Sequence, residues 1–177
     1  ADPKTGEVIA NQNIRADAPA DLLILSSPSI LPAAKLLASY KGAKGIAAKA
    51  YSTKEIYHEF SAGKQDVTAI RDFIRLKKPR YVLFLGDATV DYKGINKVAT
   101  AIERQNYVPS YESRESLQPL QTYVSDDYFG LMADNQGEWL EGNEAMNEPI
   151  ALGIGRIPAR SFEEANTVVN KLISYET

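Results

Sequence analysis

Residues 81–87, with the sequence YVLFLGD, decide the fold of this chain. The run 81–85 is apolar throughout and ends at a glycine, which is the pattern of a short strand buried on both faces of a parallel sheet. Three further segments are strand candidates: 22–25, 45–51 and 149–154. A sheet of about four mainly parallel strands is therefore expected.

Helical patterns separate the strand candidates. Apolar residues recur at helical spacing over 31–38, and a second amphipathic pattern covers 67–74. Between them, Ser52 and Glu55 form a capping box for a helix that extends through Phe60. The alternation of strands and helices predicts an α/β layer fold, with helices on both faces of the sheet.

A final helix is predicted from a second capping box, Ser161 with Glu164. Its apolar face is expected to consist of Ala165, Val168, Val169, Leu172, Ile173 and Tyr175.

Two segments fall outside this alternation. Residues 1–20 are polar and rich in turn formers, and we interpret them as a linker or the end of a preceding domain. The segment 86–130 lacks periodicity over a length that is unusual for a structureless loop, so it is expected to be a functional or partner-facing excursion. Within and after it, the run 128–132 suggests an antiparallel extension.

Composition limits the chemistry. The 177 residues carry a formal net charge of −3, which gives no reason to expect nucleic acid or an anionic membrane as a partner. No apolar run approaches the length of a membrane span. Cysteine is absent and His58 is the single histidine, so this stretch of chain contains neither a disulfide nor a thiol nucleophile.

Acidic side chains gather after the central strand candidate. Asp87 follows it almost directly, Asp91 comes shortly after, and Asp126 and Asp127 lie in the later loop. The carboxyl ends of parallel strands form the functional rim of an open α/β sheet, so these carboxylates could converge on a hard cation such as calcium. Aspartate is also a preferred turn and cap residue, and the residues alone favour that structural interpretation.

Other patterns give weaker hypotheses. The run GIGRIP at 153–158 differs from a dinucleotide fingerprint because Pro158 replaces the third glycine, so nucleotide binding is rejected. We expect Arg156 in this run to pair with an acid of the rim. His58 has no identifiable nucleophile or carboxylate partner and is interpreted as a surface or half-buried helix residue.

Two groups of side chains are interpreted as structural or interfacial. Cations at a helix C-terminus complement its dipole, so the basic stretch is expected to be a solvated helix end. It comprises Arg71, Arg75, Lys77, Lys78 and Arg80. Tyrosines crowd the irregular middle, where they suit an interface or loop packing. They are Tyr107, Tyr111, Tyr123 and Tyr128.

Several segments follow one another in a recognisable order: YHEFSAG at 57–63, DVTAIRDFI at 66–74, YVLFLGD at 81–87 with Asp91 and Tyr92, VPSY at 108–111, SDDYFG at 125–130, and GIGRIP at 153–158 with Glu164 and Ala165. Each is weak alone. Together, from about Ala20 to the end, they resemble the gingipain-like cysteine peptidases, a caspase-like family of clan CD. EFSAG at 59–63 with DDYF at 126–129 places the resemblance nearest to the type IX secretion sortases of that family.

The resemblance implies a caspase-like three-layer sandwich in which two α/β subdomains form the peptidase domain. Residues 21–177 would be subdomain A, with 1–20 as the linker or preceding domain and one sheet edge left for the second subdomain. The catalytic His and Cys of the family lie in that second subdomain, so the resemblance assigns no catalytic residue to this chain.

The same resemblance implies a function. The sortases of this family remove carboxy-terminal sorting signals from secreted cargo, so the parent is expected to be an exported cysteine endopeptidase at the cell surface or outer membrane. This non-catalytic half would brace the catalytic half. Its expected partners are that missing subdomain, the cargo signal and other type IX secretion components, without nucleic acid or direct membrane insertion. No cofactor is required, and calcium sites known in the family favour a structural calcium at Asp87, Asp91, Asp126 and Asp127.

Two alternatives stay open. The chain could be a scaffold or binding module of a family member that has lost its catalytic residues. It could also be a magnesium-dependent phosphoryl-transfer domain that uses Asp87. The second alternative is disfavoured because the first strand candidate ends in serines, where that chemistry needs further carboxylates.

Overall fold

A computed structural model gives the structure of residues 11–91, 100–102, 105–112, 124–133, 136 and 149–177. These residues form a parallel sheet with the strand order β2-β1-β3-β6. The strands are β1 (Leu22–Ser26), β2 (Ala48–Ser52), β3 (Tyr81–Leu85) and β6 (Gly153–Ile157). The predicted α/β fold with about four parallel strands is confirmed.

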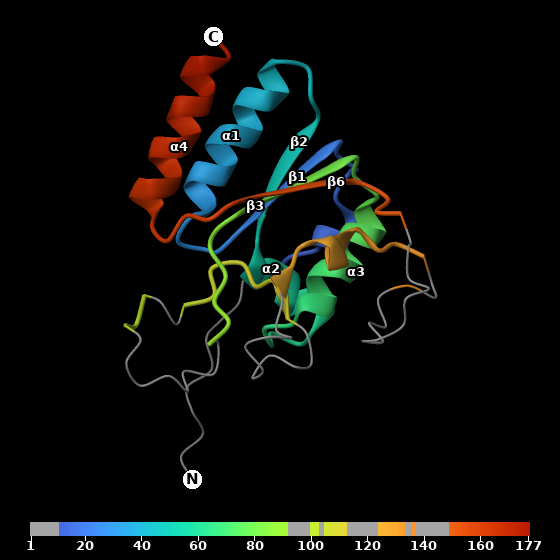
Figure 1. Cartoon of the computed structure of the whole chain (residues 1–177). Coiled ribbons are helices and arrows are strands. Elements are labelled where there is room, and N and C mark those ends of the chain that lie inside the picture. The colour runs from blue at the N-terminus through green and yellow to red at the C-terminus, as the bar shows by residue number, and fades with distance from the viewer. Residues whose placement is uncertain (1–10, 92–99, 103–104, 113–123, 134–135, 137–148) are drawn as a thin grey trace.

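Helices cover both faces of this sheet. Figure 1 shows α1 (Leu31–Ala43) and α4 (Phe162–Tyr175) together on one face, and α2 (Thr53–Phe60) and α3 (Val67–Lys77) on the other. The described residues also form two short 3-10 helices and a two-stranded antiparallel pair. These are η1 (Ile14–Ala16), η2 (Asp127–Gly130), β4 (Tyr111–Glu112) and β5 (Val124–Ser125).

Local chemistry starts α2 and α4 where the sequence predicts. The Ser52 hydroxyl accepts from the Glu55 amide, and the Glu55 carboxylate accepts from the Ser52 amide at 2.7 Å, so the first capping box is confirmed. At α4, Ser161 caps the Glu164 amide in the same way. The Glu164 carboxylate, however, accepts from the amide of Arg160, which precedes the cap, so only half of the second box forms.

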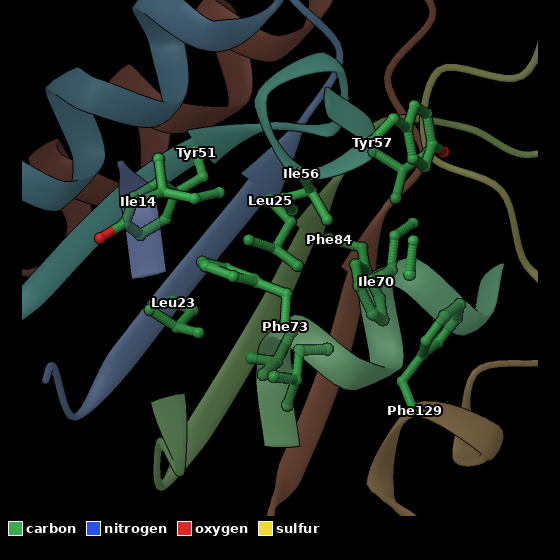
Figure 2. Packing of buried hydrophobic residues seen from close by; sticks show 14 of the residues in the cluster. Ile14, Leu23, Leu25, Tyr51, Ile56, Tyr57, Ile70, Phe73, Phe84 and Phe129 are labelled. Carbon is green, nitrogen blue, oxygen red and sulfur yellow. The ribbon is translucent and has the colours of Figure 1, made fainter. Parts of the chain in front are cut away.

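The alternation of side chains along the strands divides the core into two clusters. One cluster lies beneath α2 and α3, where Phe84 packs against Phe129 and Phe73 against Tyr51 (Figure 2). The other lies beneath α1 and α4 and contains Ile24, Leu37, Leu85, Ala165 and Val169. Burial on both faces is why the central strands read as continuous apolar runs.

The last strand is displaced from its predicted position. It begins at Gly153, not at 149, because Gly153 lies beside Tyr81 in the register of β3. A β-carbon at Gly153 would lie only 2.8 Å from a ring carbon of Tyr81, so this pairing needs the glycine. Ile150, which the sequence placed inside the strand, is 42% exposed.

Two other expectations are wrong in detail. The run 128–132 does not form an antiparallel extension, because 127–130 is a 3-10 helix and the antiparallel pair joins 111–112 to 124–125. Tyr175 lies beyond the core at the end of α4 and is 90% exposed, so it does not belong to the apolar face of that helix. Residues 1–10, Tyr92 and Tyr123 lie outside the described residues.

Candidate functional site

The carboxyl ends of the strands form a rim, and the segment that follows β3 is fixed there by backbone hydrogen bonds. Gly86 has a φ of +152°, and a β-carbon there would lie 3.0 Å from side-chain carbons of both Tyr107 and Val108. The Gly86 amide donates to the Ile157 carbonyl, and the carbonyl of Asp87 accepts from the amides of Tyr107 and Val108. The segment after β3 is therefore fixed between the end of β6 and the 107–108 backbone, and a glycine is required there.

Arg156 of β6 organises the rim. Its guanidinium donates two hydrogen bonds to the Asp126 carboxylate, from Nε to Oδ2 and from Nη2 to Oδ1, each 2.7 Å long. Nη1 donates to the carbonyls of Gly86 and Val108 at 2.8 and 2.7 Å. Such a bidentate, charge-assisted pair is among the strongest polar contacts in proteins, and the predicted pairing of Arg156 with an acid of the rim is confirmed.

Supporting contacts fix the geometry of this pair. The Arg156 guanidinium carbon lies 4.9 Å from the centre of the Phe84 ring, and the Ser110 hydroxyl donates to Asp126 Oδ1 at 2.7 Å. The side chains of Arg156 and Asp126 are only 15% and 22% exposed. Arg156 thus ties β3, the 108–110 segment and the start of η2 into one unit.

A second ion pair lies farther out. Asp87 accepts from Arg160 Nε at 2.6 Å through Oδ2, and from the Ala88 amide through Oδ1. The Arg160 side chain is 51% exposed, so water screens this pair far more than the one inside the rim.

The four predicted metal ligands do not form one group. Asp87 and Asp126 each have an arginine partner, Asp127 is exposed, and the described residues contain no cluster of three His, Cys, Asp or Glu side chains suited to a metal ion. Carboxylates already neutralised by guanidinium groups do not fit the ligand set of a hard cation. The calcium site therefore stays a prediction without support from this arrangement. Asp87 likewise gives no observation in favour of phosphoryl transfer.

Tyrosines of the excursion pack within the domain. Tyr107 and Tyr128 are buried, and Tyr128 stacks on Tyr111 with 4.8 Å between the ring centres. The Tyr128 hydroxyl lies 3.2 Å from that of Thr68 on α3. These described tyrosines serve loop packing, the second of the two roles that the sequence left open.

The prediction of a solvated helix end is wrong for two cations of the basic stretch, Arg71 and Lys77. Arg71 is 7% exposed and donates to the carbonyls of Leu131 and Gln136 at 2.7 and 2.6 Å. Lys77 is 5% exposed. Both lie at the helical spacing of Val67, Ile70 and Ile74, so the periodicity predicts that they face the core. Their charge alone favours exposure to solvent, and this is why the prediction failed. Lys78 and Arg80 are exposed, as expected.

His58 lies half-buried on α2, as the sequence predicted, and its Nδ1 atom is buried without a hydrogen-bond partner among the described residues. None of the described helices is both long and apolar enough to cross a membrane.

The sequence model of peptidase family C25 matches residues 15–177. The chain belongs to this family, the gingipain family of cysteine peptidases. The chain is also similar to the crystal structure of dimeric latent PorU from Porphyromonas gingivalis, with a TM-score of 0.77 and 25% sequence identity. The match covers 95% of this chain and 16% of the PorU chain, so the present chain spans about a sixth of the length of that chain. No curated protein matches it significantly.

Proposed function

We propose that this chain is the amino-terminal, non-catalytic half of a gingipain-like cysteine peptidase domain, which braces the catalytic half. One observation carries the proposal: residues 15–177 match a cysteine peptidase family, yet the chain contains no cysteine. On this proposal, the thiolate activated by histidine comes from residues outside this chain.

The outer side of β6 is the surface that suits the catalytic half. Gly153 and Ile157 bond to the backbone around β3, so the intervening amides and carbonyls of Ile154 and Arg156 point the other way. None of the described residues forms a strand on that side. An unpaired edge of this kind accepts another strand or a covering segment.

An apolar pocket continues this edge. It has a volume of about 530 Å³ and lies between the end of β6 and the start of α4. Its walls include Ile157, Pro158 and Val168, with Glu163 and Glu164 among the lining side chains. Farther along α4, Leu172 is only partly covered by the described residues. Apolar walls with carboxylates beside them favour a partner surface that carries an aliphatic and a basic side chain.

The parent protein is proposed to be a type IX secretion sortase at the cell surface or outer membrane. It would cleave carboxy-terminal sorting signals of secreted cargo and work beside other type IX secretion components. The similarity to PorU and the membership of family C25 support this proposal.

Activity measurements test whether the catalytic residues lie outside this chain. The 177-residue chain alone should hydrolyse no peptide in a thiol-dependent manner. A longer protein that includes the rest of the peptidase domain should react with a thiol-directed probe. Thiol-dependent turnover by the chain alone, or a longer protein with no reactive cysteine, would overturn the proposal.

Paired substitutions test the bracing surface. In the longer protein, Leu172→Glu, one turn of α4 beyond the pocket residue Val168, should lower peptidase activity and loosen the association of the two halves after limited proteolysis. Leu36→Glu on α1 is the matched control, because Leu36 is 41% exposed on a different helix. Equal effects of the two substitutions would place the interface elsewhere.

A further inference from the structure

Residues 12–18 are packed against the domain by a dense set of specific contacts. We call them the clasp segment, and the residues that bind them the clasp surface. The clasp surface consists of Lys49 and Tyr51 on β2, Glu55, Glu59 and Phe60 on α2, and Lys77 on α3. The sequence alone predicts a linker or the end of a preceding domain here.

Glu59 anchors the backbone of the clasp segment. Its Oε1 accepts from the amide of Ile14 at 2.7 Å and from Nε2 of Gln12 at 3.1 Å. Its Oε2 accepts from the amide of Arg15 at 3.3 Å. The Glu59 side chain is 13% exposed, so these charge-assisted bonds are largely shielded from water.

Side chains of the clasp segment fill complementary positions. Ile14 is 5% exposed and belongs to the core cluster beneath α2 and α3 (Figure 2). Arg15 donates to the Glu59 carbonyl at 2.7 Å, and its guanidinium carbon lies 3.9 Å from the centre of the Phe60 ring. An aliphatic residue and a cation are therefore recognised side by side.

Lys77 depends on the clasp segment for its hydrogen-bond partners. Its buried ammonium donates to the carbonyls of Asp17 and Arg15 at 2.7 and 3.1 Å. Burial lowers the pKa of Lys77, while the Asp17 carboxylate opposes that shift. A buried ammonium without these acceptors would be costly, so binding of the clasp segment and burial of Lys77 favour each other.

Two further contacts complete the recognition. The Tyr51 hydroxyl donates to Asp17 Oδ2 at 2.9 Å, and Lys49 Nζ donates to the Ala18 carbonyl at 2.8 Å. The clasp surface thus presents an acceptor carboxylate for one end of the segment and three donors for the other, with an apolar site between them.

We propose that the clasp surface is a peptide-binding site, occupied in this chain by its own residues 12–18. It recognises an amide, an aliphatic, a cationic and an anionic side chain at the spacing of Gln12, Ile14, Arg15 and Asp17. Glu55 and Glu59 lie on α2, which starts at the carboxyl rim, so occupation of the site also fixes that helix. This site is separate from the outer side of β6 and does not depend on the peptidase proposal.

Peptide binding in trans tests the site. In the full chain, Ile14→Ser with Arg15→Ala should release the clasp segment. A labelled peptide of residues 11–20 should then bind this variant and raise its Tm, while the wild-type chain, whose site is filled, should not bind it. The same peptide with Ile14→Asp should bind at least tenfold more weakly. A folded variant that binds neither peptide, or binds both equally, would overturn the proposal.

Hydrogen exchange on the wild-type chain keeps the proposal testable if that variant does not fold. The amides of Ile14 and Arg15 should be protected, and Glu59→Ala should speed their exchange at least tenfold. The amide of Glu164, which is capped by Ser161 at the other face of the sheet, should be unaffected. Unprotected amides at Ile14 and Arg15 in the wild-type chain would contradict a bound clasp segment.

Discussion

Arg156 holds both carboxylate oxygens of Asp126, each at 2.7 Å, and so joins the last strand of the sheet to the loop that precedes η2. The same guanidinium also donates to two backbone carbonyls of the rim, those of Gly86 and Val108. Loss of Arg156 would leave a half-buried carboxylate and two carbonyls without these donors.

Arg156→Leu is therefore expected to lower the free energy of unfolding by about 3 kcal/mol. Arg160→Leu is the matched control, because it removes the same side chain from an aspartate pair at a position that is 51% exposed. The control should cost less than about 1 kcal/mol. Urea denaturation of both variants measures the difference. Equal losses would show that the rim pair is not the stronger of the two.

Gly86→Ala should destabilise the fold by about 1–3 kcal/mol, because a φ of +152° is strained for any residue with a β-carbon. The new methyl group would also crowd Tyr107 and Val108. Gly42→Ala within α1 meets nothing within 4 Å and should instead stabilise the protein by about 0.5–1 kcal/mol. Thermal unfolding of the two variants should give shifts in Tm of opposite sign. A lower Tm for both variants would contradict the explanation by backbone strain and crowding at Gly86.

Two buried tyrosines predict instability in alkali. Burial raises the pKa of Tyr57 well above its usual value near 10, and Asp66 adds to the effect. Burial, followed by the hydrogen bond to Asp17, raises the pKa of Tyr51. The unfolded chain releases these protons above about pH 10 while the folded chain keeps them, so the free energy of unfolding should fall as the pH rises through that range.

Tyr57→Phe isolates one of these contributions. The Tyr57 hydroxyl has no hydrogen-bond partner among the described residues, so this substitution should change stability little at pH 7. Between about pH 10 and 12 the variant should lose less stability than the wild-type chain. Parallel pH dependence of the two proteins in denaturant titrations would show that Tyr57 is not held in its protonated form.

Arg71→Met should cost about 2 kcal/mol, because the carbonyls of Leu131 and Gln136 would lose a buried cationic donor. The backbone after η2 should also become more accessible to proteases. Arg80→Met, at an exposed position that follows the same helix, should leave both properties unchanged. Denaturant unfolding and limited proteolysis provide the two readouts, and unchanged cleavage in Arg71→Met would contradict an anchoring role.

The sequence by itself determined the features that depend on neighbours along the chain. Continuous apolar runs placed β1 and β3, and the Ser52–Glu55 capping box placed the start of α2, because burial on both faces and cap hydrogen bonds are local signals. The absence of cysteine excluded a thiol nucleophile from these residues. The ordered motifs also pointed to the peptidase family that the comparison then showed.

Only the tertiary structure decided which charges are buried and what they bind. Arg71 and Lys77 belong to a basic stretch that looks like a solvated helix end in the sequence. In the structure they lie on the buried face of α3 and donate to carbonyls that are far away in the sequence. The start of β6 at Gly153 is set by its pairing with Tyr81 of β3, and not by the apolar residues that precede it. Residues 12–18 look like a linker because their hydrogen-bond partners, Glu59 and Lys77, become neighbours only when the chain has folded. Long-range pairing of polar groups leaves no local pattern, and that is why the sequence did not show it.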